Sequence, residues 1–93
     1  MKKIKGTEIR KGDYIKIRYT SDRIRDAHRI YLALESWNGN DNPDRVLFKC
    51  IKENMEMKVS YGIGDVYKWR VDTDMKIYKL NKKEAEHLWL YEI

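Results

Sequence analysis

The segment DYIKIRY, residues 13–19, alternates apolar and polar side chains with a period of two. In an extended chain, successive side chains point to opposite faces, so Ile15 and Ile17 fall on one face and the residues between them on the other. This pattern predicts a half-buried β-strand. Lys11-Gly12-Asp13 before it predicts a tight turn.

Similar segments follow along the chain. The patterns of residues 29–37, 45–53 and 55–65 each predict one strand, and residues 66–80 predict two strands broken at Asp72-Thr73-Asp74. The stretch 38–44, NGNDNPD, predicts a loop. The strands are expected to bury their apolar sides in one core, made by Ile15, Ile17, Ile30, Leu32, Leu34, Val46, Phe48 and Val59.

The C-terminal segment has a different pattern. Asn81 followed by Glu84 has the spacing of a capping box, which predicts a helix from about Lys82 to His87, with an extension to Leu90 left open. Its apolar residues Ala85, Leu88 and Trp89 stand at i, i+3 and i+4, which would let the helix cap one end of a barrel. The whole chain predicts a mostly β fold: a curved sheet of five to six strands or an SH3-like barrel, with one short C-terminal helix.

Length and composition predict one domain, residues 1–93, with an apolar fraction of 42% and a charged fraction of 38%. No run approaches the roughly 18 apolar residues of a membrane-spanning helix, and no apolar segment follows the basic start as in a signal peptide. Cys50 has no second cysteine to pair with and lies in an apolar run, so we expect a buried thiol. These features favour a cytoplasmic location.

The positive charge is concentrated near the start of the chain. Residues 1–30 contain ten Lys or Arg and four Asp or Glu, a balance of +6, whereas residues 31–93 have a balance of −1. The stretch from Arg18 to Arg45 contains five arginines and no lysine, and the planar guanidinium of arginine fits phosphate oxygens with two parallel hydrogen bonds. The predicted phosphate contacts are Lys16, Arg18, Arg23, Arg25 and Arg29. The alternative is a solvated connection in which Asp22 and Asp26 partly neutralise the arginines.

Aromatic residues make up 12% of the chain. Tyr14 and Tyr31 fall opposite the apolar stripes expected for their strands, and rings on a basic sheet can stack on nucleobases. We therefore predict stacking roles for Tyr14 and Tyr31. The alternative is that tyrosine and tryptophan fill the interior and ends of a small barrel.

The sequence gives little support to metal binding, dinucleotide binding or catalysis. One cysteine and two distant histidines fit no zinc-binding spacing, so no metal site and no cofactor is predicted. The Gly62-Ile63-Gly64 corner lacks the third glycine of a dinucleotide-binding motif and predicts a bend. No nucleophile elbow or paired-carboxylate signature is present, so an enzyme is not predicted.

The opening TEIRKGDYIKIRY is similar to the first strand of SH3-like barrels, including Tudor-type and KOW-type domains, in which a Gly-Asp corner feeds an alternating strand. The basic, tyrosine-rich style also resembles small accessory proteins of bacteriophages. We predict a non-enzymatic module that binds nucleic acid or a nucleotide-type ligand through the basic N-terminal face. The alternative is a protein-interaction module, such as a phage-encoded inhibitor or adaptor that docks on an acidic host protein.

Overall fold

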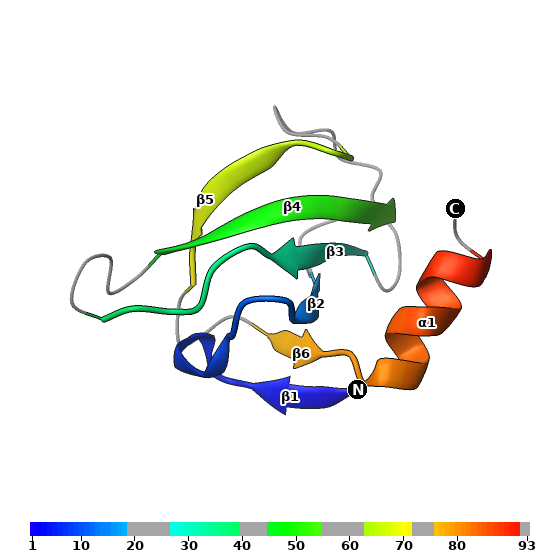
Figure 1. The fold of residues 1–93 in the computed structure, drawn as a ribbon, viewed down its shortest axis with the longest axis horizontal. Helices are drawn as coiled ribbons and strands as arrows, with labels where there is room; N and C mark the ends of the chain where they lie inside the picture. Colours follow the sequence, from blue (N-terminus) through cyan, green and yellow to red (C-terminus); the bar gives the residue numbers. More distant parts are fainter. Residues whose placement is uncertain (19–26, 40–44, 55–62, 72–75, 92–93) are drawn as a thin grey trace.

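The computed structural model describes residues 1–18, 27–39, 45–54, 63–71 and 76–91. Six strands form one antiparallel sheet in the order β1-β6-β2-β3-β4-β5, followed in the chain by a single helix (Figure 1). The fold is mostly β with a short C-terminal helix, as the sequence predicted. The elements are β1 (Lys2–Ile4), a 3-10 turn η1 (Gly6–Glu8), β2 (Tyr14–Arg18), β3 (His28–Ala33), β4 (Arg45–Asn54), β5 (Val66–Arg70), β6 (Ile77–Lys79) and α1 (Lys82–Tyr91).

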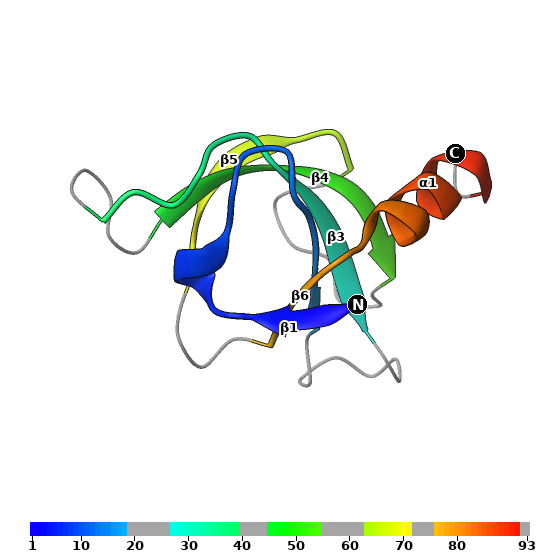
Figure 2. The same cartoon turned by 60° about the horizontal axis from the view of Figure 1, so that its bottom comes forward.

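The sheet curls around its core without closing (Figure 2). Its two outermost strands are β1 and β5. The segments that follow these strands meet, because a Cβ atom placed on Gly6 would lie 2.8 Å from Cβ of Val71. A close contact between η1 and the end of β5 therefore joins the two margins of the open sheet.

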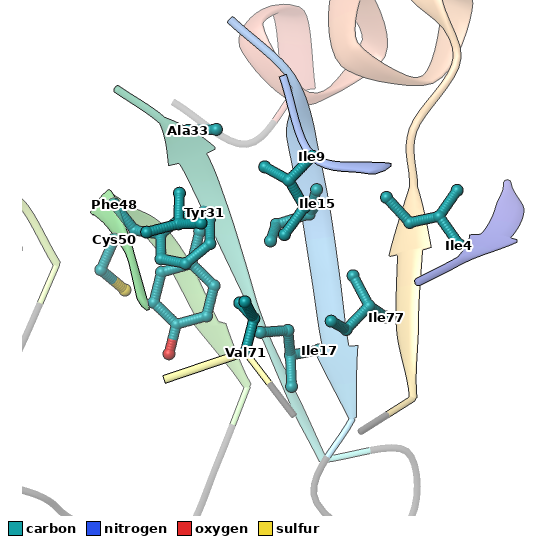
Figure 3. Packing of buried hydrophobic residues seen from close by; sticks show 11 residues of the cluster. Ile4, Ile9, Ile15, Ile17, Tyr31, Ala33, Phe48, Cys50, Val71 and Ile77 are labelled. Carbon is teal, nitrogen blue, oxygen red and sulfur yellow. The ribbon is translucent and has the colours of Figure 1, made fainter. Parts of the chain in front are cut away.

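The alternation in β2 was predicted correctly. Ile15 and Ile17 are fully buried on the inner face, whereas Lys16 is half-buried and Arg18 is exposed on the outer face. The turn before the strand also forms, with Gly12 at a φ of 92°, a conformation that favours glycine. Figure 3 shows the core that these residues enter, made by Ile4, Ile9, Ile15, Ile17, Tyr31, Ala33, Val46, Phe48, Cys50, Val71 and Ile77.

The predicted facing of β3 was wrong. Tyr31 and Ala33 enter the main core, and Leu32 and Leu34 are only half-buried. Ile30 is buried as expected, but on the outer face, in a small second cluster with Leu80. Both faces of this strand are apolar, so alternation alone does not decide which one faces inward. The cross-strand pairing decides it, because Tyr31 lies opposite Ile15 on one side and Cys50 on the other.

Helix α1 begins where the capping box placed it. The Asn81 side chain accepts a hydrogen bond from the Glu84 N–H at 2.8 Å, and the Glu84 side chain accepts one from the Asn81 N–H at 3.0 Å. This bond from the Asn81 backbone holds the pKa of Glu84 below its usual range. The helix is longer than the predicted core segment, and it stands outside the sheet past the end of β6 (Figures 1 and 2).

Several predictions fall outside the described residues. They include the strand expected after residue 54 with its core residue Val59, the break at Asp72-Thr73-Asp74, most of the loop 38–44, and the packing of Leu88 and Trp89. Strands β4, β5 and β6 lie where the sequence predicted them. The bend before β5 is confirmed at Gly64, whose φ is 90° and whose N–H donates to the Cys50 carbonyl at 2.7 Å.

Replacing Gly6 with alanine is expected to lower the free energy of unfolding by about 1–3 kcal/mol, the usual cost of overpacking a filled site. The added methyl group would lie 2.8 Å from Val71 Cβ and 2.9 Å from Val71 Cγ2, so the two margins of the sheet would have to move apart. Urea denaturation followed by circular dichroism measures the change.

A double-mutant cycle separates this steric cause from a backbone cause. Val71→Gly removes both contacting atoms, so it should offset part of the cost of Gly6→Ala. Gly12→Ala is the matched control: no atom lies within 4 Å of its added Cβ, and its cost comes from the positive φ. The cost of Gly12→Ala in unfolding free energy should simply add to that of Val71→Gly. If the cost of Gly6→Ala adds to it in the same way, the Gly6–Val71 contact does not hold the margins together.

Cys50 is expected to react slowly with thiol reagents in the native protein. Its side chain is buried, and burial raises the pKa of the thiol, although the nearby Arg29 guanidinium acts in the opposite direction. The protein therefore holds Cys50 as the protonated thiol at neutral pH and denies reagents access to it. Colorimetric titration with and without urea tests this. Complete labelling in native buffer at the rate seen in urea would contradict it.

Candidate functional site

Three of the predicted ligand contacts lie together on β2. Tyr14, Lys16 and Arg18 occupy alternate positions of this strand and point to the outer face of the sheet. Arg23 and Arg25 lie outside the described residues. The structure therefore brings together part of the predicted site on one surface.

Arg29, the fourth predicted arginine contact, does not belong to this surface. It pairs across the sheet with Ile17, whose side chain faces the core, and its own side chain is only 5% exposed. Its Nη2 lies 3.2 Å from Oε2 of Glu53. A guanidinium that is buried and paired with a carboxylate is not available to a phosphate, so this prediction was wrong.

The prediction for Tyr31 was also wrong. The side chain is completely buried, and its ring lies against that of Phe48 with centroids 5.6 Å apart at an angle of 48° (Figure 3). A ring in this position stabilises the core and cannot stack on a ligand. The alternative interpretation of the aromatics, in which they fill the interior, holds for this residue. Trp37 likewise packs against the main core while partly exposed.

The outer face of the sheet is rich in positive charge. We define it as the side of the sheet opposite the main core, and the strand pairings place seven basic side chains on it. Among the described ladder positions on that side, none is Asp or Glu. A carboxylate from outside the ladders still reaches one of these cations, because Oε1 of Glu35 lies 3.6 Å from Nζ of Lys68. The basic residues of the outer face are Lys3, Lys16, Arg18, Arg45, Lys49, Lys52 and Lys68.

A β-bulge in β4 helps to separate the charges. Ile30 pairs with Lys52 but Tyr31 pairs with Cys50, so Ile51 is the extra residue. Without the bulge, strict alternation from the buried Cys50 would turn Lys52 inward and Glu53 outward. With it, Glu53 reaches Arg29 on the inner side and Lys52 joins the outer face.

Two tyrosines accompany these cations. Tyr78 of β6 is half-buried and pairs with Lys3 on one neighbouring strand and with Lys16 on the other. Tyr14 is half-buried and packs against the small outer cluster of Ile30 and Leu80. A hollow of about 330 Å³ opens beside Tyr14, between the start of β2 and the first turn of α1, and its wall includes Leu80 and Ala85.

Sequence reasoning missed six residues of the outer face: Lys3, Arg45, Lys49, Lys52, Lys68 and Tyr78. The inward pattern of Val46, Phe48 and Cys50 could have indicated that Arg45 and Lys49 point outward. No signal in the sequence reveals the bulge that turns Lys52. Strand β1 has only three residues, which is too short for a recognisable alternation, so Lys3 and its partner Tyr78 could not be placed.

In the described part of the chain, no three His, Cys, Asp or Glu side chains gather as metal ligands would. Its one α-helix is too short and too polar to cross a membrane. Comparisons with protein-family models, curated proteins and solved structures give no match for this chain.

Proposed function

We propose that this protein binds nucleic acid through the outer face of its sheet. The observation that carries the proposal is the excess of positive charge there. The ladder positions of that face that the structure describes hold seven cations and no carboxylate, and Glu35, outside the ladders, pairs with one of the seven, Lys68. A surface of one sign attracts a partner of the opposite sign, and the phosphate backbone presents a regular series of negative charges.

The tyrosines add a second kind of contact. Tyr78 lies between two lysines, and Tyr14 borders a hollow partly lined by apolar side chains. Proteins that bind nucleic acid on a sheet combine cations for the backbone with rings for the bases.

A second candidate is docking on an acidic protein. The same cations would complement acidic side chains, and Ile63 and Val66, at the turn before β5 and at its start, are 66% and 53% exposed. Exposed apolar residues beside charged ones are typical of protein interfaces. Such an interface would depend less on salt than a series of phosphate contacts.

Replacing Lys3, Lys16 and Lys49 with glutamine is expected to weaken binding to a labelled oligonucleotide and to flatten its salt dependence. The plot of log affinity against log salt should become shallower by about 0.7–0.9 for each phosphate that no longer meets a cation. Fluorescence anisotropy over a series of KCl concentrations measures both quantities.

The matched control replaces Lys2, Lys5 and Lys11 with glutamine. These exposed lysines lie off the outer face, and their loss changes the net charge by the same amount. Equal effects of both triple variants would show that net charge alone governs binding and that the outer face is not the site. No binding of wild type to any oligonucleotide at low salt would leave the acidic protein partner as the function to test.

A further inference from the structure

One line of residues crosses five neighbouring strands of the outer face. Lys3 pairs with Tyr78, Tyr78 with Lys16, Lys16 with Ile30, and Ile30 with Lys52. We call these five residues the transverse row. Cations alternate along it with one aromatic and one aliphatic side chain, although the five residues come from distant parts of the chain.

The spacing of the transverse row follows from the sheet itself. Adjacent strands are roughly 4.8 Å apart, so the backbones of successive lysines of the row stand about 10 Å from each other. Between them lie the half-buried Tyr78 and the buried Ile30. In the register of the sheet, Tyr78 therefore lies between Lys3 on one neighbouring strand and Lys16 on the other. A single strand of nucleic acid presents the complementary alternation, with phosphates on its backbone and flat bases between them.

The curvature of the sheet distinguishes a single strand from a duplex. The core lies on the inner side of the curled sheet, so the outer face is convex (Figure 2). Six strands span roughly 24 Å. A duplex is stiff over a far greater length than this, so it would touch a convex face at only a few places. A flexible strand can follow the curve and reach cations on every part of it.

We infer that the ligand of the outer face is single-stranded nucleic acid that crosses the sheet along the transverse row, with a base stacked at Tyr78. This inference rests on the proposed function and specifies the form of nucleic acid. The ring of Tyr78 supplies a sequence-tolerant platform, and Lys3, Lys16 and Lys52 contact the backbone on either side of it.

The first test uses the unmodified protein. One labelled oligonucleotide without self-complementarity is titrated alone and after annealing to its complement, at the same low salt concentration. Charge alone favours the duplex, which has the higher linear charge density. Tighter binding of the single strand is expected. Equal or tighter binding of the duplex would overturn the inference while leaving the proposed function standing, and no binding of either would remove the proposed function itself.

The second test addresses the path of the strand. Tyr78→Leu keeps an apolar side chain but loses the ring. It is expected to weaken single-strand binding by about 5- to 20-fold. This is the lower part of the range for a lost stacked base, because the side chain of Tyr78 is half-buried. Tyr78→Phe keeps the ring and should bind like wild type. Circular dichroism confirms that both variants are folded.

A pair of triple variants completes this test. Glutamine at Lys3, Lys16 and Lys52 removes the cations of the transverse row, whereas glutamine at Arg45, Lys49 and Lys68 removes three cations elsewhere on the same face. The row variant is expected to lose more affinity for the single strand. Equal losses, or unchanged binding by Tyr78→Leu, would mean that the strand does not follow the row.

Discussion

Truncation of Phe48 to alanine is expected to lower the free energy of unfolding by about 3–5 kcal/mol. The side chain is completely buried at the centre of the main core, and its ring packs on that of Tyr31. Removing it leaves a cavity that its neighbours on β2 and β3 cannot fill, because their backbones are held by the sheet hydrogen bonds on both sides. Urea denaturation monitored by tryptophan fluorescence measures the loss.

Two further variants make this result interpretable. Leu47→Ala alters the neighbouring residue of the same strand, which is half-buried on the outer face, and should cost clearly less. Phe48→Leu retains most of the side-chain volume, so it should fold even if the alanine variant does not fold. A loss below about 1 kcal/mol for Phe48→Ala would place this side chain outside the core and would reverse the assignment of the two faces of β4.

Replacing Glu53 with glutamine is expected to cost about 3 kcal/mol, the lower end of the range for removing one member of a buried ion pair. The side chain of Arg29 has little access to water, since it is only 5% exposed, whereas that of Glu53 is 22% exposed. The opposite change, Arg29→Met, should therefore be less costly, because the remaining carboxylate can be hydrated at the surface. Urea denaturation of both single variants compares the two costs.

The double variant with Arg29→Met and Glu53→Met tests the cause. It removes both charges and should be close to wild type in stability, because no uncompensated charge stays in the interior. Lys52→Ala, on the adjacent outer position, is the surface control and should change stability by about 0.5 kcal/mol at most. If Glu53→Gln costs no more than this control, the Arg29 guanidinium is hydrated, and it becomes again a candidate for contact with an anionic ligand.

The sequence predicted the elements of this fold better than their pairing. Strand β2 was recognised because one of its faces meets the core and the other meets water, which leaves a visible alternation. Strand β3 is apolar on both faces, since Ile30 enters the outer cluster while Tyr31 enters the core, so its orientation depends on partners distant in the chain. The order β1-β6-β2, which joins the two ends of the chain to its first long strand, has no local signal.

In the candidate site too, residues placed by local alternation were predicted, and residues placed by strand pairing were not. The outward positions of Lys16 and Arg18 follow from the local alternation and were predicted. Arg29 was assigned to the wrong face, because the register of β3 against β2 and β4 decides to which face its side chain points. The bulge at Ile51 then places Lys52 rather than Glu53 on the outer face, and a bulge depends on tertiary contacts that a single sequence does not display.

The short strand β1 bears on how copies of this protein behave when they are crowded together. As the end strand of an open sheet, it pairs with β6 on one side and has no strand partner on its other side among the described residues. Such a margin is the usual starting point for edge-to-edge aggregation, and short length and lysines are the usual protection against it. Strand β1 has both, since it is three residues long and exposes Lys2 and Lys3. Two molecules that met along this margin would bring their lysines together, so their mutual repulsion would oppose pairing of one sheet with another at β1.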